Sequence, residues 1–179
     1  RGSLSYGQSV AAFLQRELID APSAQAIPCG ADLPPALHPL HWGNSYALPF
    51  EAVRLEGPWT ALRWTKYSWI DQTLHTTAPG ARLSFDFNGR GLLFGCDFGR
   101  SSAEFRWRVD GGAWQSSVRD RPEWMGVDGW FRPSLLCDDL NAGPHTCEVE
   151  VVHGNPDGAH PTVLYSGTTF DLALIGVIA

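Results

Sequence analysis

The residues of this chain best suited to binding chemistry are tryptophans that border one loop. Trp124 and Trp130 flank a short Gly-rich stretch that carries Asp128, and Arg132 follows close behind. Flat indole rings stack on the apolar face of a pyranose, while a carboxylate or a guanidinium takes the hydroxyl hydrogen bonds. We therefore predict a glycan-binding surface in which Trp124 and Trp130 stack and Asp128 and Arg132 are the polar partners.

A second aromatic segment lies earlier in the chain, where Trp59, Trp64, Tyr67 and Trp69 crowd together. From this segment we add Trp69 to the predicted binding residues. The competing interpretation is that the exposed rings plug one end of the fold or dock on a neighbouring domain, because such rings bury well at any apolar contact. Both interpretations stay open on the sequence alone.

Catalytic patterns are missing from the sequence, and we assign no catalytic residue. No GxSxG nucleophile motif occurs. His38 and His41 are the best candidates for a general base, and pairing one of them with a Ser is the alternative hypothesis of a small esterase. Loop histidines packed against Trp42 explain the same residues, so we expect this chain by itself to be non-catalytic.

Charge and composition exclude several function classes. The chain has 179 residues, 13 Lys plus Arg and 19 Asp plus Glu, and therefore a formal charge of −6. An acidic chain with a single Lys is a poor counterion for phosphates, which argues against a nucleic-acid partner. No apolar run reaches the ~20 residues of a membrane span. The four Cys form no CxxC pair, which argues against zinc.

The pattern of apolar residues predicts a helix, a linker and then a β domain. Apolar residues at helical spacing predict one helix over Val10–Ile19, with Ser9 as its N-cap. A Pro-rich linker follows, and from Ser45 the period changes to two. We therefore divide the chain into residues 1–44, a helix and linker that could end a preceding domain, and residues 45–179, a β-sandwich of eight to ten strands.

Alternation within the predicted strands sorts side chains into core and surface. Trp107 falls on a core face, and so does Cys96, which we expect to be a buried free thiol. Cys137 and Cys147 bracket a connection between two strands and could pair. Arg106 and Arg108 should face Glu148 and Glu150 if their strands are neighbours, giving ion pairs across a solvated face. The two arginines lie in the segment FRWRV, and the two glutamates lie in the segment CEVEV.

Several motifs together carry a resemblance to a known fold. The strand-and-turn run PGARLSFDFNG, the hairpin VDGG and the AGPHTCEV segment occur in that order. They resemble the galactose-binding-like jelly roll, an accessory domain of many carbohydrate-active enzymes and esterases, over Ser45–Ala179. The resemblance implies an all-β, antiparallel jelly-roll sandwich. It also allows a structural calcium, for which the acidic turns with Asp138, Asp139 and Asn141 or with Asn155 and Asp157 are the candidates, although turn composition alone explains those residues.

The first residues resemble part of a different family. The segment LSYGQSVAAFL is similar to the last helix of SGNH/GDSL-type hydrolases, in which a catalytic His precedes this helix; only Arg1-Gly2-Ser3 precedes it here. The resemblance implies an adjoining catalytic domain in an SGNH-type esterase. Our prediction is a non-catalytic module that binds or presents a glycan or polysaccharide, in a secreted or periplasmic protein. The alternatives are the small esterase and a purely structural docking domain.

Overall fold

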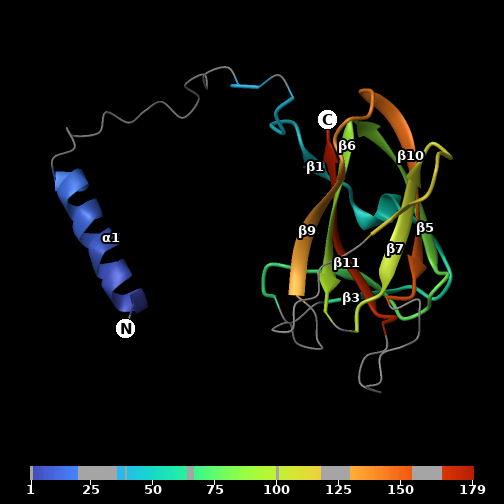
Figure 1. Cartoon of the computed structure of the whole chain (residues 1–179), viewed down its shortest axis with the longest axis horizontal. Helices are drawn as coiled ribbons and strands as arrows, with labels where there is room; N and C mark the ends of the chain where they lie inside the picture. Colours follow the sequence, from blue (N-terminus) through green and yellow to red (C-terminus); the bar gives the residue numbers. More distant parts are fainter. Residues whose placement is uncertain are drawn as a thin grey trace. The chain divides into compact units, whose positions relative to one another are not determined.

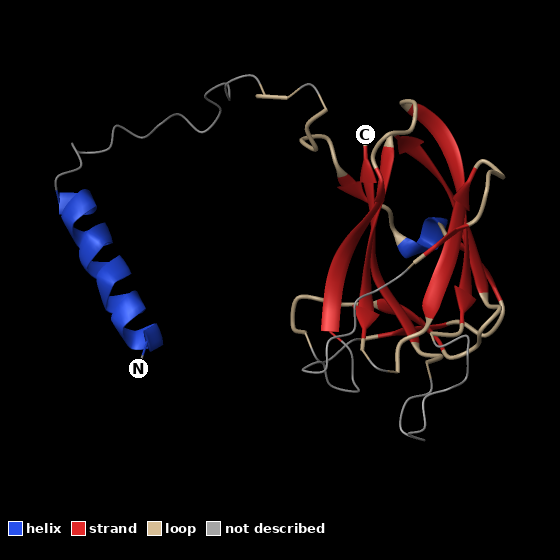
Figure 2. Ribbon diagram, in the orientation of Figure 1, coloured by secondary structure: helices blue, strands red, loops and turns tan. Residues whose placement is uncertain are grey.

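The computed structural model describes residues 2–19, 36–38, 40–63, 67–99, 101–117, 130–154 and 167–179. The chain divides into two compact units, Arg1–Pro39 and Leu40–Ala179. Among the described residues, the first unit holds helix α1 and the second holds every strand (Figure 1; Figure 2). Most of the predicted Pro-rich linker lies outside the described residues.

Helix α1 spans Gly2–Ile19 and therefore begins earlier than the predicted Val10. Ser9, predicted as the N-cap, lies inside the helix. A capping residue alone does not fix where a helix begins. The residues before Ser9 contain no Pro, so the helix extends toward the N-terminus. Within the described part of the chain, no helix has both the length and the apolar character needed to cross a membrane.

The second unit is built from two antiparallel sheets, as the alternating pattern predicted. Sheet A has the order β3-β4-β11-β6-β9, with β1 paired to β11, and sheet B has the order β2-β5-β10-β7-β8. The strands of sheet A are β1 (Tyr46–Ala47), β3 (Thr60–Leu62), β4 (Thr73–Thr76), β6 (Gly91–Phe98), β9 (Trp130–Cys137) and β11 (Phe170–Ile178). The strands of sheet B are β2 (Arg54–Glu56), β5 (Arg82–Gly89), β7 (Glu104–Val109), β8 (Gln115–Ser116) and β10 (Gly143–Val152).

The described residues contain eleven strands, slightly more than the eight to ten predicted. The excess comes from strands of only two or three residues, such as β1 and β8, which are too short to show alternation in the sequence. A single 3-10 turn, η1 (Phe50–Ala52), connects β1 to β2. The all-β fold with one N-terminal helix is therefore confirmed.

Aromatic rings from both sheets fill the space between them. Phe94 of sheet A lies 5.6 Å from Phe105 of sheet B, and Phe105 lies 5.5 Å from Phe170 of sheet A, between ring centroids. All three rings are fully or almost fully buried, and Trp107 is 7% exposed, as predicted. Burying one such ring contributes up to about 3 kcal/mol. This core holds the two sheets together and leaves their outer faces to carry function.

One irregularity in β11 changes which residues face outward. The register between β11 and β6 shifts between Leu172 and Leu174. Such a bulge inserts an extra residue and reverses the alternation beyond it. Leu172 and Ile175 are therefore both buried, whereas Leu174 lies on the outer face of sheet A, where it lines a hollow described below. Strict alternation along the strand would place Leu174 on the same face as Leu172, and the bulge reverses that placement.

The cysteine predictions are half correct. Cys96 is a buried free thiol, as predicted. Cys137 and Cys147 are also free thiols, so the predicted bridge between them is wrong. Cys137 ends the edge strand β9 of sheet A, while Cys147 lies in the middle of sheet B between Phe85 and Val109. Burial raises the pKa of the Cys147 thiol, which keeps it protonated and unreactive.

Candidate functional site

Four aromatic rings gather around the edge strand of sheet A and form what we call the four-ring cluster: Tyr67, Trp69, Trp130 and Phe131. Ring centroids are 5.5 Å apart for Tyr67 and Trp69, 6.5 Å for Tyr67 and Trp130, and 4.9 Å for Trp69 and Phe131. Trp69 is 63% exposed and Trp130 is 54% exposed. The cluster therefore presents two indole rings to solvent, although buried placement is the usual fate of large aromatic side chains.

The cluster is assembled from two segments that are distant in the sequence. Tyr67 and Trp69 belong to the connection between β3 and β4, whereas Trp130 and Phe131 begin β9. Successive residues of a strand point to opposite faces, so Trp130 and Phe131 lie on opposite sides of β9. The connection contacts both of them, which wraps the cluster around the edge of the sheet.

Gly95 makes room for Phe131 on the outer face of sheet A. It lies opposite Pro133 in β9, and a Cβ atom on it would come within 2.5 Å of the Phe131 ring. A glycine at this position therefore allows the Phe131 ring to approach the backbone of β6 this closely. The position of Phe131 in turn holds Trp69 edge-on, with an interplanar angle of 83°.

A hollow of about 590 Å³ opens beside Trp69, and we call it the Trp69 hollow. Trp69, Phe131 and Leu174 supply apolar walls, and Asp71 and Gln72 continue the chain from Trp69 along its rim. The remaining lining residues belong to the β1–η1 region, to the connection before β4 and to β11: Ala47, Leu48, Pro49, Phe50, Glu51, Ile70 and Ala173. Aromatic walls with a few exposed carboxylate and amide groups are typical of a site for a polar ligand with apolar faces.

The structure brings together only part of the predicted site. Trp69 and Trp130 both belong to the four-ring cluster, joined by Tyr67. Arg132 lies on the side of β9 opposite Phe131, with its guanidinium carbon 5.5 Å from the centroid of the Phe98 ring. It does not line the Trp69 hollow. Trp124 and Asp128 lie outside the described residues.

Sequence reasoning did not select Phe131, Glu51, Asp71 or Gln72. For three of them the sequence held a clue, namely their closeness to a predicted tryptophan. Phe131 is adjacent to Trp130, and the Asp71-Gln72 pair begins two residues after Trp69. Glu51 had no such clue. It reaches the hollow only because β1 pairs with β11 and η1 follows β1 directly, which places a distant segment on the same face.

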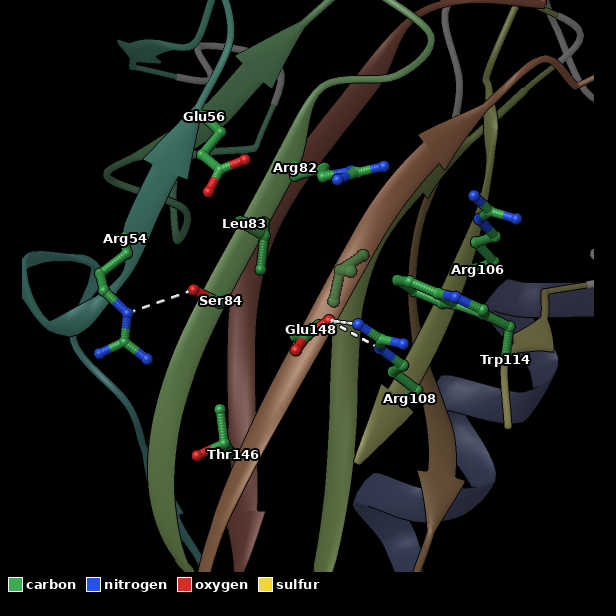
Figure 3. Close-up of a pocket in the computed structure, with 11 residues that line it drawn as sticks. Arg54, Glu56, Arg82, Leu83, Ser84, Arg106, Arg108, Trp114, Thr146 and Glu148 are labelled. Carbon is green, nitrogen blue, oxygen red and sulfur yellow. Dashed lines mark hydrogen bonds and ion pairs between the residues drawn. The ribbon is translucent and has the colours of Figure 1, made fainter. Parts of the chain in front are cut away.

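The outer face of sheet B carries a different hollow, of about 420 Å³, and a network of ion pairs (Figure 3). Glu150 accepts hydrogen bonds from Arg106 at 2.9 Å and from Arg82 at 2.9 Å. Arg108 pairs with Glu148, its Nε donating at 2.6 Å. These pairs confirm the predicted charge pairing, because β10 lies directly beside both β5 and β7.

Trp114 belongs to this same network on sheet B. Its ring centroid lies 4.7 Å from the Arg106 guanidinium carbon and 4.5 Å from that of Arg108, and Figure 3 shows the ring between the two side chains. Cation–π contacts of this kind contribute about 0.5–1 kcal/mol each at exposed sites. The Trp114 ring is thus occupied by intramolecular cation–π contacts, whereas a ligand could stack on an exposed ring.

Two carboxylates on sheet B, Glu150 and Asp86, are stabilised in their charged form. Burial by itself would raise the pKa of Glu150, but the hydrogen bonds and charges of Arg106 and Arg82 together lower it. Hydrogen bonds from Arg54 and Thr146 lower the pKa of Asp86 at the margin of the same face. This face is therefore internally neutralised across its strands.

The metal-ligating side chains among the residues that the structure describes are dispersed. No group of three or more His, Cys, Asp or Glu side chains among them could hold a metal ion. His41 Nδ1 accepts a hydrogen bond from the Gly43 amide at 2.9 Å, which is a local turn contact. Ser102 is 1% exposed and donates to Asp97 at 2.5 Å, so it holds a turn together.

His145 joins two neighbouring turns through its ring nitrogens. One ring nitrogen lies 2.6 Å from an Asp110 carboxylate oxygen, and the other lies 2.7 Å from the Asn141 carbonyl. The Asn141 carbonyl and then the Asp110 carboxylate raise the pKa of His145. The same residue closes the turn that leads into β10.

Comparisons with known proteins rest on structure alone, because no family model and no curated protein sequence matches the chain. A two-domain esterase (CEX) active on acetylated mannans gives a TM-score of 0.73 at 14% identity, covering 98% of this chain and 46% of that chain. A crystal structure with the same description, co-crystallized with mannopentaose, gives 0.71 at 13% identity, covering 98% and 45%. A family two carbohydrate esterase from Cellvibrio japonicus gives 0.50 at 14% identity, covering 74% and 32%.

These comparisons establish the fold of the chain. It spans less than half the length of the structures that it matches. Over 98% of its length the chain is therefore similar in fold to one part of a two-domain esterase. The likeness confirms the predicted resemblance at the level of the fold.

Proposed function

We propose that the second unit is a non-catalytic carbohydrate-binding module that presents a glycan to an adjoining esterase domain. The observation that carries this proposal is Trp69, an indole that is 63% exposed at the rim of a hollow with carboxylate and amide groups. A contiguous exposed aromatic surface, here Trp69 with the rest of the four-ring cluster, marks a binding or docking site more often than a single exposed ring does. A pyranose fits, since its C–H face stacks on the ring while its hydroxyls bond to polar neighbours.

We infer the wider binding surface from residues around this ring. Trp130 provides a second exposed indole through the four-ring cluster. Trp124, Asp128 and Arg132 remain part of the proposal on sequence grounds. The adjoining domain is proposed to be of SGNH/GDSL type, and the galactose-binding-like jelly roll remains the proposed superfamily. The neighbours with described activity toward acetylated mannans support a glycan as the ligand class.

The test is a glycan array with the full chain, followed by calorimetric titration of any ligand found. Trp69→Ala should weaken binding by more than tenfold, because a central stacking ring commonly contributes about 2 kcal/mol or more. Trp114→Ala is the matched control, since that ring lies on sheet B between two arginines. Equal binding by wild-type protein and a folded Trp69→Ala variant would refute this site.

A docking domain is the second candidate function, and one observation favours it. A smaller hollow of about 250 Å³ lies on the outer face of sheet A, with walls that include Trp42, Tyr46, Leu93 and Leu174. Nearly all of its lining is apolar. A blank glycan array would favour this function over the carbohydrate-binding one.

A further inference from the structure

We propose that the Trp69 hollow selects uncharged glycans and rejects acidic ones such as those that contain uronate residues. This inference rests on the proposed carbohydrate-binding function and narrows its ligand class. It is carried by the polar groups of the hollow, which among the described residues are two carboxylates, Glu51 and Asp71, and one amide, Gln72.

The two carboxylates in the hollow lack a counter-charge. Neither Glu51 nor Asp71 forms an ion pair with a described residue, and both are exposed. The described lining of the hollow includes no Arg, Lys or His. A ligand placed against Trp69 therefore meets a negative potential that no described cationic residue of the hollow compensates.

The opposite face of the sandwich shows that this arrangement is particular to sheet A. Four arginines line or border the sheet B hollow: Arg54, Arg82, Arg106 and Arg108. Each of them is paired with a carboxylate from a neighbouring strand. The arginines that line the sheet B hollow are thus paired with carboxylates, whereas no described arginine lines the Trp69 hollow.

Physical chemistry turns this charge distribution into selectivity. A carboxylate accepts hydrogen bonds through two oxygens, so Glu51 and Asp71 suit sugar hydroxyls, which donate. An acidic sugar in the same place would bring like charges together, a repulsion of about 1 kcal/mol for each pair at 4 Å even in bulk water. With two carboxylates, we expect at least about tenfold weaker binding at low salt, and salt should reduce the difference by screening.

The experiment compares matched neutral and acidic ligands on the full chain. The panel is mannopentaose and cellopentaose, each beside its C6-oxidised uronate form, titrated by calorimetry at low and high salt. The wild-type protein should bind a neutral member at least about tenfold more tightly than its uronate form at low salt. Affinity for the neutral member should not change with salt.

The double variant Glu51→Gln/Asp71→Asn should bring the neutral and acidic affinities within about threefold of each other. The control is Glu56→Gln/Asp139→Asn, which changes the net charge equally at exposed acidic residues outside the hollow and should keep the wild-type preference. Melting curves confirm that every variant is folded.

The possible outcomes separate the two proposals. Trp69-dependent binding without any neutral preference, or a preference that survives in the double variant, overturns the selectivity and leaves the carbohydrate-binding function standing. Absence of binding to every neutral ligand of the panel and of the array overturns both. A preference that disappears in the control variant as well would assign it to overall charge and overturn the role of Glu51 and Asp71.

Discussion

The outer faces of sheets A and B use charged and aromatic side chains in opposite ways. On sheet B, Glu148 and Glu150 each accept hydrogen bonds from arginines of neighbouring strands, and Trp114 lies between two guanidinium groups. On sheet A, Trp69 projects into solvent, and the carboxylates beside it have no arginine partner among the described residues.

The difference separates a face that stabilises the fold from a face available to a ligand. Cross-strand pairs satisfy the hydrogen-bonding groups of sheet B internally, and each contributes about 0.2–1 kcal/mol. A ligand on that face would have to replace those partners. The polar groups of the Trp69 hollow contact water instead, so a ligand gains their hydrogen bonds at the cost of displacing solvent.

The largest effect should come from filling the space that Gly95 leaves open on sheet A. In Gly95→Ala, the new methyl group would lie 2.5 Å from the Phe131 ring and 2.9 Å from Leu174 Cβ, so Phe131 must move and the wall of the hollow with it. We expect a loss of about 1–3 kcal/mol in the free energy of unfolding. Glycan affinity should fall by about tenfold if Phe131 holds Trp69 in place.

Gly176→Ala is the matched control for this prediction, because it lies on the same face with its nearest neighbour, Leu93, at an ordinary 3.4 Å. It should change the free energy of unfolding by less than about 0.5 kcal/mol. Chemical denaturation measures both values. Equal stability of the two variants would show that Phe131 adapts without cost.

A carboxylate on sheet B should matter more for stability than one on sheet A. Glu150→Gln removes the charged partner of Arg82 and Arg106 at a side chain that is only 12% exposed, and it should cost about 1–2 kcal/mol. Glu51→Gln removes no ion pair among described residues and should cost less than about 0.5 kcal/mol.

Urea denaturation of the two variants tests this prediction directly. Glycan binding supplies the converse readout, because Glu150→Gln should leave affinity unchanged. A larger stability loss in Glu51→Gln than in Glu150→Gln would reverse the assigned roles of the two faces.

The smallest effect should be a pH dependence located at the end of sheet B. Its neighbours raise the pKa of His145, so the stability from this residue is present below its unfolded pKa of about 6.5 and is lost as pH rises through the folded value. His145 and Thr146 lower the pKa of Asp110, so the carboxylate contribution is lost only at acid pH. Asp110 is about half exposed, so solvent screening keeps the effect small.

The measurement is the difference in melting temperature between wild-type protein and His145→Gln at pH 5.5 and pH 8.5. The difference should be larger at pH 5.5, where both ring nitrogens carry protons and donate to their acceptors. A larger difference at pH 8.5 would mean that His145 acts through packing against Phe87, whose ring centroid lies 5.4 Å away.

Local patterns were enough to predict the architecture of the sandwich and part of its surface. Period-two alternation placed Phe105 and Trp107 in the core. It placed Arg106 and Arg108 on the outer face of the same sheet, beside Glu150 and Glu148 of the neighbouring strand. These predictions succeeded because strand geometry alone determines which face a side chain occupies. The helix was also predicted, but its start was not, because capping preferences are weak beside a continuous helix-compatible run.

The sequence by itself determined the inventory: an acidic chain, short alternating strands and an excess of tryptophan. The tertiary structure decided which of those residues meet. A bulge in β11 places Leu174 on the outer face. The connection between β3 and β4 places Trp69 against Phe131. Glu51 reached the same hollow through the pairing of β1 with β11. Bulges and strand pairings between distant segments depend on the packing of the whole chain, so no local pattern could predict them.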